Sequence, residues 1–265
     1  MKTKKYLAAT LCLLIFAVFT AQKNEKPDWK ELRGDHFIVY HVGKDGFAQE
    51  VLRKAEEYYR RIGTDLGYER RSNFWQWDNR VKIYVYETQE DYIEETGRQS
   101  WSHGFADYDN KIIYSYEWKQ GFLESLLPHE ITHLIFRDFV GKQGEVPTWL
   151  DEGVAQWEEV EKRNSVREMM RFYLKDGKGY SLKGLTTVDI QNVSNQLAVQ
   201  IFYVQAASIV DFLVARYGSE QFIFFCRQLR DGKDIDEALR FAYPTKLSNS
   251  KEMEEEWKEY IKTVF

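Results

Sequence analysis

The sequence predicts an α+β fold in which a small β-sheet comes first along the chain and helices follow. Segments with the alternation and the β-branched and aromatic content of strands are confined to residues 36–116, whereas the later chain has the periodicity of amphipathic helices. A run of strands followed by a run of helices is typical of α+β domains and not of doubly wound sheets. With 265 residues, 43% of them hydrophobic, the chain can bury one sizeable core.

The N-terminal half alternates strands and helices. The expected strands are rich in valine, isoleucine and tyrosine, and the longer helix places Phe47, Val51 and Ala55 at helical spacing. In chain order we expect a strand at 36–42, a helix at 46–66, a strand at 80–87, a short helix at 88–96, and a strand at 111–116 that follows a turn at 107–110.

The C-terminal half is predicted to be mainly helical. Its apolar residues recur at the spacing of one helix face, and we expect helices at 119–139, 149–161, 165–175, 198–216, 219–230, 234–242 and 251–263. The chain has no repeats, low-complexity tracts or linkers rich in proline and glycine. We therefore expect residues 22–265 to form a single domain after a leader.

The first 21 residues have the features of a secretory signal peptide. The basic segment MKTKKY precedes the apolar run LAATLCLLIFAVFTA, and the polar segment QKNEKPDWK follows at once. The apolar run is also short for a membrane span. We expect cleavage near Ala21 and a secreted, periplasmic or cell-surface protein without stable membrane insertion, with a retained membrane anchor as the alternative.

Charge and cysteine content narrow the function further. The net charge of −5 and the lack of a basic stripe or a nucleic-acid-binding module argue against a nucleic-acid partner. Cleavage after Ala21 removes three lysines, and the more acidic chain that remains disfavours adhesion to anionic membranes. That chain keeps one cysteine, Cys226, which excludes an internal disulfide and which we interpret as a buried small hydrophobic residue. None of these features indicates an oligomeric state.

The strongest chemical motif is PHEITH at 128–133. His129 and His133 are four residues apart, so they project from the same face of a helix and both imidazoles can reach one metal ion. Glu130 lies at the flank of that site, where it can take a proton from a metal-bound water. The residues around the motif are apolar, and buried polar groups need partners. A metal would supply one, and the alternative is that these are ordinary core or surface residues.

A second segment, PTWLDEGVA at 147–155, offers a third ligand. A catalytic zinc site has three protein ligands and an open fourth position. Glu152 follows His133 after 18 intervening residues, a length that suits a helix end, a glycine-containing loop and a return by a second helix. Thr148 and Asp151 have the spacing of a capping box that would begin this second helix.

Together, HEITH, the 18-residue gap and WLDEGVA resemble the pattern HExxH-x18-E of the gluzincin metallopeptidases, in its context W-L-x-E-G-x-A. The closest resemblance is to the small bacterial peptidase MA-like domains. GFADYDNKIIY at 104–114, YVQAAS at 203–208 and EMEEEWKEYI at 252–261 are similar to segments of those domains, so the resemblance covers roughly residues 35–263. It implies a zincin-like fold, with a small mixed sheet, a mainly helical C-terminal half and the active-site helix between them.

The resemblance also implies roles for particular residues. His129, His133 and Glu152 would bind Zn2+, and Glu130 would accept a proton from the zinc-bound water and pass it to the leaving amine. Gluzincins often have a second donor to the developing oxyanion on the C-terminal side of the site. Tyr203 is our candidate because it begins the matching helix, and a core tyrosine with a satisfied hydroxyl is the alternative.

A peptide or protein substrate follows from the same resemblance. We expect the strand at 111–116 to be the edge of the sheet above the site, where an extended peptide could pair with it by β-augmentation. Gluzincin aminopeptidases hold the free amine of the substrate with a segment G-x-M-E-N. This chain has no match to that segment, GFADYD being the nearest in position, so we expect an endopeptidase.

The neighbours of the site are predicted from proximity in the sequence. A metal-bound histidine normally donates its other N–H to an acceptor, and Asp138 and Gln156 are candidates for that acceptor, with solvated or capping roles as the alternative. His103 could line the cleft. The charged runs at 158–163 and 252–256 are predicted to be solvated helix faces.

Two other functions are compatible with the same residues. One is a zinc-bearing or zinc-free domain that binds a partner without catalysis, although the intact Glu130 favours an enzyme. The other is hydrolysis of a non-protein amide, such as a peptidoglycan cross-link, by the same zinc chemistry.

Overall fold

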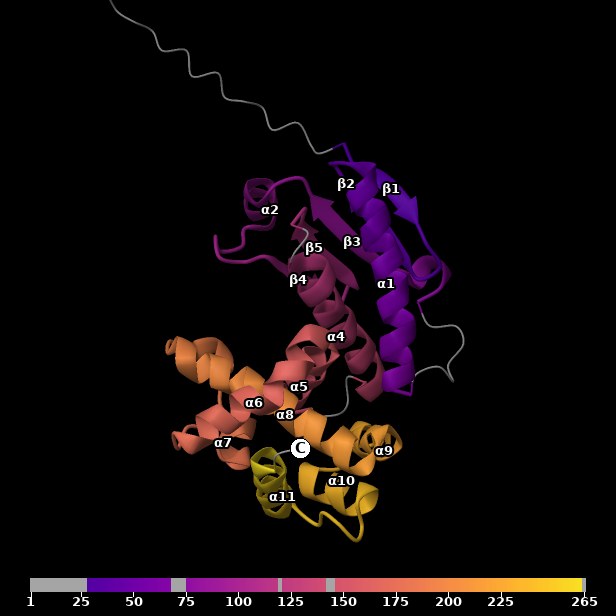
Figure 1. Cartoon of the computed structure of the whole chain (residues 1–265). Coiled ribbons are helices and arrows are strands. Elements are labelled where there is room, and N and C mark those ends of the chain that lie inside the picture. The colour runs from indigo at the N-terminus through magenta and orange to yellow at the C-terminus, as the bar shows by residue number, and fades with distance from the viewer. Residues whose placement is uncertain (1–27, 68–74, 119–120, 142–145, 264–265) are drawn as a thin grey trace, which may run out of the picture.

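The computed structural model describes residues 28–67, 75–118, 121–141 and 146–263, so the expected leader at 1–21 lies outside the described residues. In the view of Figure 1, the sheet and α1 occupy the upper part of the molecule and the later helices the lower part, with α4 between them. The small mixed sheet followed by a mainly helical half confirms the predicted α+β fold.

The described residues form one mixed sheet with the strand order β1-β2-β3-β5-β4. The three central strands are parallel, whereas β1 and β4 pair antiparallel at the two edges. The predicted strands at 36–42, 80–87 and 111–116 are confirmed as β2, β3 and β5. The bounds are β1 Lys30–Arg33, β2 Phe37–His41, β3 Val81–Tyr86, β4 Gly104–Asp107 and β5 Ile112–Tyr116.

Helices cover one face of the sheet and form the core with it. The helix α1 (Asp45–Asp65) connects the parallel strands β2 and β3, as a crossover must, and packs against β2 and α4. Val39, Ile83 and Ile113 lie in register on this face and are fully buried. The opposite face carries a row of stacked aromatic rings in register across four strands, formed by Tyr40, Tyr84, Tyr114 and Phe105.

The expected position of the sheet edge is wrong. The strand at 111–116 is not the edge, because the turn after Asp107 returns the chain and β4 pairs with the outer side of β5. The edge strand on this side is therefore Gly104–Asp107. It is only four residues long and has no β-branched residue, so its sequence does not indicate a strand.

The helices agree closely with the periodicity of the sequence. The predicted helix at 119–139 consists of a π-helical turn, η3, and the longer α4, and the predicted helices after it begin and end within a few residues of the observed ones. The bounds are α2 Gln89–Thr96, η3 Phe122–Leu126, α4 Leu127–Val140, α5 Thr148–Glu158, α6 Val160–Lys175, α7 Leu182–Thr187, α8 Gln196–Tyr217, α9 Ser219–Arg230, α10 Ile235–Ala242 and α11 Ser250–Lys262.

The centre of the helical half is α8, which packs against α5, α6 and α9. Its length and hydropathy fall in the range of a membrane span, and 56% of its most apolar window is buried inside the protein. Burial on several sides by other helices is the usual position of a continuously apolar helix in a core. Cys226, on the neighbouring α9, is buried as predicted.

The capping box predicted from Thr148 and Asp151 is wrong. Thr148 is the first residue of α5, the preceding Pro147 has extended backbone, and no side chain caps this end of the helix. Asp151 is instead buried, and its carboxylate contacts side chains of α4. Because Asp151 does not cap the helix, its carboxylate can contact His133.

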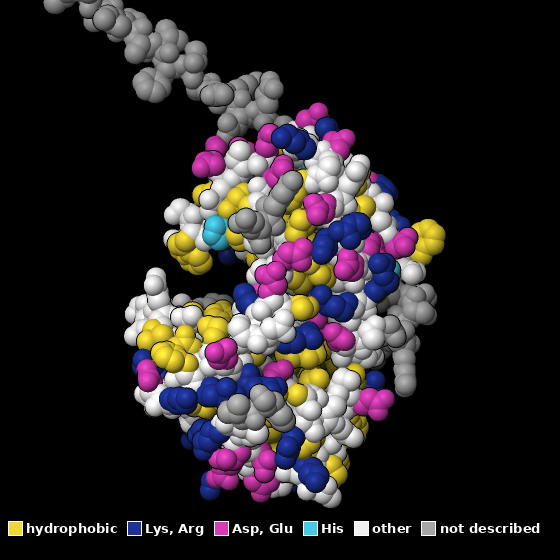
Figure 2. Space-filling model, viewed as in Figure 1, with side chains coloured by type: hydrophobic (Ala, Val, Ile, Leu, Met, Phe, Trp, Pro, Cys, Tyr) yellow, Lys and Arg dark blue, Asp and Glu magenta, His cyan; other side chains and the backbone are white. Residues whose placement is uncertain are grey.

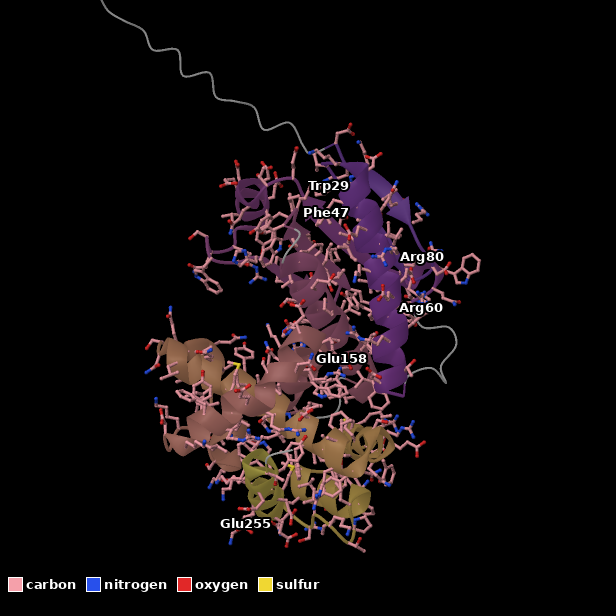
Figure 3. All side chains as sticks on the ribbon, viewed as in Figure 1. Trp29, Phe47, Arg60, Arg80, Glu158 and Glu255 are labelled. Carbon is pink, nitrogen blue, oxygen red and sulfur yellow. The ribbon has the colours of Figure 1, made fainter. Side chains whose placement is uncertain are left out.

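The charged run at 158–163 is not simply a solvated helix face, as was expected. The helix breaks at Glu159, whose backbone is no longer helical (φ −77°, ψ 89°), and α6 begins at Val160. The break turns Glu158 and Glu159 inward, and these two side chains have 0% and 1% exposure. Figure 3 shows the labelled Glu158 in the middle of the molecule, where α1 meets the helical half.

Candidate metal centre and active site

Three side chains converge from two helices. His129 and His133 project from one face of α4, and Glu152 comes from the first half of α5, which packs against α4. The Nε2 atoms of the two histidines are 3.1 Å apart, and each is 3.5 Å from Oε2 of Glu152. The structure thus brings together the three residues that the sequence motifs single out, in a group whose ligand atoms all lie within 4.8 Å of one another.

The hydrogen bonds of the two rings determine which nitrogen is free. Nδ1 of His129 lies 3.0 Å from Oε1 of Glu159, and Nδ1 of His133 lies 2.9 Å from Oδ1 of Asp151. A carboxylate only accepts, so each Nδ1 carries a proton, and a ring in its neutral form keeps a lone pair on Nε2. Burial opposes protonation, yet Glu152 and Glu159 raise the pKa of His129, and Asp151 and Glu152 raise the pKa of His133 well above its usual range. A metal cation between the two Nε2 atoms and Glu152 would take the place of those protons.

The donor set fits a zinc ion. Two imidazole nitrogens and one carboxylate oxygen are a known ligand set for catalytic zinc, and they leave a fourth position open. Two nitrogen ligands of a tetrahedral zinc lie roughly 3.3 Å apart, given Zn–N bonds of about 2.0–2.1 Å. The observed 3.1 Å between the Nε2 atoms is close to that value. His129, His133 and Glu152 could thus hold Zn2+ without rearrangement of α4 or α5.

His133 is supported by a chain of contacts that we call the Asp151 support, made of Asp151, Arg137 and Tyr108. Oδ2 of Asp151 accepts two hydrogen bonds from the Arg137 guanidinium, at 2.7 and 3.0 Å, while Oδ1 faces the His133 ring. Burial alone would raise the pKa of Asp151, but His133 and Arg137 hold it below its usual range. The Arg137 guanidinium in turn lies 3.8 Å from the centre of the Tyr108 ring.

His129 is supported differently, by what we call the Glu159 support, made of Glu159, Ser125 and Lys162. Oε2 of Glu159 accepts a hydrogen bond from the Ser125 hydroxyl and lies 2.7 Å from Nζ of Lys162. Burial opposes ionisation of this carboxyl, yet its hydrogen bond with His129 and the charge of Lys162 lower its pKa. Glu159 therefore stays an acceptor for the His129 ring.

The hydrogen-bond partners of the two Nδ1 atoms are thus not Asp138 or Gln156. Asp138 accepts from Trp75 at 3.0 Å and from Lys111 at 2.7 Å, so it fixes a loop rather than a histidine. Asp138 and Gln156 are close to the motifs in sequence, but the acceptors are Asp151 and Glu159. The sequence instead predicts a capping role for Asp151 and a solvated charged run around Glu159.

Glu130 and Tyr203 flank the three convergent residues. Glu130 is buried beside His129, and its Oε2 lies 3.4 Å from the hydroxyl of Tyr108. Tyr203, on α8, is half-buried, and burial and the charges of Glu152 and Glu130 raise its pKa to about 12. Tyr203 therefore keeps its proton at neutral pH, and it lies close enough to Glu152 and Glu130 for their charges to raise its pKa.

The histidines outside the motif lie in other surroundings. Nδ1 of His103 is 2.7 Å from the Tyr116 hydroxyl, and its ring stacks on Trp118 at 4.5 Å. Nδ1 of His36 lies 2.7 Å from Oε2 of Glu56, and His41 is buried on β2. In the described residues, the group of side chains able to hold a metal is therefore the one at α4 and α5.

The surface is hollowed next to this group. Figure 2 shows a recess at the left of the view, between the half that carries the sheet and the helical half, and α4 and α5 lie to the right of this recess, at its inner end (Figure 1). Such an opening gives a large substrate access to a site between two halves of a fold.

Comparison with known proteins agrees with this geometry. Residues 73–263, which are more than half of the chain, match the family model Peptidase_MA_2, described as the peptidase MA superfamily. The match includes both helices of the site and the β4–β5 hairpin. No curated protein matches the chain.

Proposed function

The chain belongs to the peptidase MA superfamily and has its peptidase-like metalloprotease fold, and from this premise we propose that it is a secreted zinc endopeptidase. The observation that carries the proposal is the pair of Nε2 atoms that face Glu152 while a carboxylate holds each Nδ1. In the proposal His129, His133 and Glu152 bind the zinc. When bound, zinc lowers the pKa of water and polarises the carbonyl that is attacked.

Glu130 is the general base of the proposal. Its carboxylate lies next to the ligands on α4, at the flank where an attacking water would stand. It takes a proton from that water and gives it to the amine that leaves. Because Glu130 is buried, little bulk water competes for that proton.

Tyr203 is proposed as a donor to the oxyanion that forms at the carbonyl. In support, it reaches the site from α8, on the opposite side from the sheet, and its raised pKa keeps the phenol a donor. Within the described residues its hydroxyl has no hydrogen-bond partner, although the residue is half-buried. An unpaired donor beside the site is suited to charge that appears only in the transition state.

We propose an extended peptide as the substrate. The edge strand β4, rather than β5, offers its free backbone groups for β-augmentation. The chain lacks the G-x-M-E-N segment of the gluzincin aminopeptidases, which favours cleavage inside a peptide. The features of residues 1–21 in the sequence support export from the cytoplasm.

The test compares purified wild type with Glu130→Gln. Both proteins are expected to bind about one zinc per chain, because Gln leaves the three ligands in place, while only wild type cleaves a mixed peptide library. Zinc content is measured by atomic emission, and cleavage by mass spectrometry of the digest. Glu161→Gln, at an exposed glutamate of α6, is the matched control and should cleave as wild type does.

Each possible failure has a separate meaning. Wild type without zinc would contradict the whole proposal. Zinc without cleavage of any peptide would favour a partner-binding domain, unless a peptidoglycan digest by the same protein releases cross-link fragments, which would favour a non-protein amide. Release of residues from a peptide end without any cleavage inside the peptide would contradict endopeptidase action.

Tyr203→Phe tests the oxyanion donor separately. The variant is expected to lower kcat tenfold or more with KM little changed, because the lost hydrogen bond forms in the transition state. Peptide turnover is measured at saturating and at low substrate concentration. A variant that turns over as fast as wild type would remove Tyr203 from the mechanism and leave it as a core tyrosine.

A further inference from the structure

Tyr108 contacts the site, although it lies in neither of the two segments that supply the metal ligands. It lies in the turn between β4 and β5, and the chain passes through β5, η3 and α4 before it reaches Glu152 on α5. The turn is closed by Asp107, whose two carboxylate oxygens accept from the backbone and side-chain amides of Asn110 at 3.1 and 2.8 Å. This local closure fixes the direction in which the hairpin presents Tyr108.

The same turn is fastened to α4. Lys111 has a left-handed backbone (φ +54°), which is uncommon for a residue with a side chain, and its Nζ lies 2.7 Å from Oδ2 of Asp138. Trp75 also donates to that carboxylate. An ion pair therefore holds the turn to the last part of α4, and such tertiary contacts are what keep an unfavourable backbone conformation in place.

Three groups of the site meet the Tyr108 side chain. Its hydroxyl donates to Oε2 of Glu130 at 3.4 Å. Its ring meets the edge of the His133 ring at 5.7 Å between centroids, with the planes at 74°. The Arg137 guanidinium covers the ring at 3.8 Å, a distance at which cation–π attraction is substantial.

These contacts form a closed series of side-chain interactions around His133. The Tyr108 ring contacts Arg137, the Arg137 guanidinium donates to Oδ2 of Asp151, and Oδ1 of Asp151 accepts from Nδ1 of His133. The ring of His133 then returns to the ring of Tyr108. Tyr108 thus contacts Glu130 directly. It contacts His133 both directly and through Arg137 and Asp151.

We propose that Tyr108 is a positioning residue of the site, whose hydroxyl orients the Glu130 carboxylate and whose ring keeps Arg137 and Asp151 aligned on His133. The inference rests on the proposed function for the role of Glu130, but the part that concerns His133 needs only a bound metal. The hydroxyl restricts the rotation of Glu130, so that one carboxylate oxygen is held and the other faces the attacking water. The ring prevents Arg137 from turning into solvent and releasing Asp151.

Two substitutions separate the hydroxyl from the ring. Tyr108→Phe removes the hydroxyl alone and is expected to lower kcat about tenfold, with KM and zinc affinity within about twofold of wild type, because a hydrogen bond to a charged base is lost while the ring contacts remain. Tyr108→Leu also removes the ring and is expected to weaken zinc binding about tenfold. Tyr114→Phe, in the same hairpin but on the outer face of the sheet, is the matched control for both.

Zinc affinity is measured by competition with a chromophoric chelator, and the absorption spectrum of the Co2+-substituted protein reports ligand geometry; neither measurement needs a substrate. Circular dichroism establishes that each variant is folded. If wild type cleaves no peptide, the proposed function fails, but the metal measurements on Tyr108→Leu still test the side-chain contacts that position His133.

The outcomes that overturn the inference are distinct. Wild-type kcat in Tyr108→Phe removes the hydroxyl from the positioning of Glu130. A raised KM at unchanged kcat would mean that the hydroxyl contacts substrate instead. A folded Tyr108→Leu variant with wild-type zinc affinity and an unchanged Co2+ spectrum would show that Arg137 and Asp151 hold His133 without the ring.

Discussion

The two histidines of the candidate site are neighbours on one helix, yet two different regions of the molecule hold them. The Asp151 support reaches His133 from the side of the sheet, through Arg137 and the β4–β5 turn. The Glu159 support reaches His129 from the junction of α5 and α6. Each delivers one carboxylate to one Nδ1 atom, so the chemistry at the two rings is the same and only the surroundings differ.

The surroundings differ in how much each carboxylate depends on a single partner. Oδ2 of Asp151 holds the Arg137 guanidinium through two hydrogen bonds, and His133 itself is almost fully buried. Oε2 of Glu159 is shared between Ser125 and Lys162, and the Lys162 side chain is half exposed to solvent. The Arg137 and Lys162 side chains are about equally exposed, at 47% and 50%, so the difference is one of geometry. Two hydrogen bonds fix one oxygen of Asp151 to a single guanidinium, whereas one oxygen of Glu159 is shared by a hydroxyl and an ammonium group.

This difference predicts unequal losses when each carboxylate becomes an amide. Asp151→Asn turns an amide N–H₂ toward the Arg137 donors and leaves a partly buried charge without its partner, so zinc affinity should fall by about 100-fold. Glu159→Gln can keep its oxygen on His129 and offer its N–H₂ to the Ser125 oxygen, so affinity should fall by about fivefold. Chelator competition near neutral pH measures both.

Two results would change this picture. Equal losses in the two variants would mean that the supports act only through the charge they place near zinc, and not through their partners. A larger loss in Glu159→Gln would mean that the junction of α5 and α6, rather than the sheet side, sets the position of the ligands. Thermal unfolding of each metal-free variant separates either result from loss of fold.

The same comparison shows which parts of the site can be predicted from sequence. His129, His133 and Glu152 are brought together by a helix period and a helix return, both of which are local features of the chain. The supports are not local. The sequence predicts a solvated face for the charged run around Glu159 and a helix break a few residues later, although the break at Glu159 is what turns its side chain inward.

In the fold, too, local features can be predicted from the sequence, whereas features that depend on tertiary contacts cannot. The α+β class and the long helices follow from periodicity, because a face that must be buried repeats along each element. The edge strand β4 does not, because its four residues become a strand only by pairing with β5. The spacing from Thr148 to Asp151 fits a capping box, but α5 begins one residue earlier than that pattern requires. Tertiary partners decided each of these cases.

The junction side also contains a second buried acid, and this predicts the dependence of its stability on pH. Burial, and then the nearby Asp65, raise the pKa of Glu158 from 4.5 to about 7, although Arg163 and Arg61 oppose the shift. Its Oε1 has no hydrogen-bond partner among the described residues, and Arg61 reaches only Oε2, at 3.4 Å. Glu158 therefore differs from Glu159, whose two oxygens are both engaged.

The folded and unfolded chains bind different numbers of protons at Glu158, and this difference gives the direction of the pH dependence. Between pH 4.5 and about 7 the folded chain keeps a proton on Glu158 that the unfolded chain has lost, so the free energy of unfolding falls as pH rises through this window. Relative to Glu158→Gln, which cannot ionise, wild type should lose about 2 kcal/mol between about pH 5 and about pH 8. Urea unfolding of the metal-free proteins measures the difference and excludes protons released by metal binding.

A parallel pH dependence in wild type and Glu158→Gln would contradict this prediction, and would mean that Arg61 and Arg163 keep Glu158 ionised in the folded chain. The exposed Glu161→Gln variant should follow wild type at every pH, because its carboxyl is solvated in both states. If only Glu158→Gln flattens the curve, the buried carboxyl at the junction of α5 and α6 accounts for the loss of stability between about pH 5 and about pH 8.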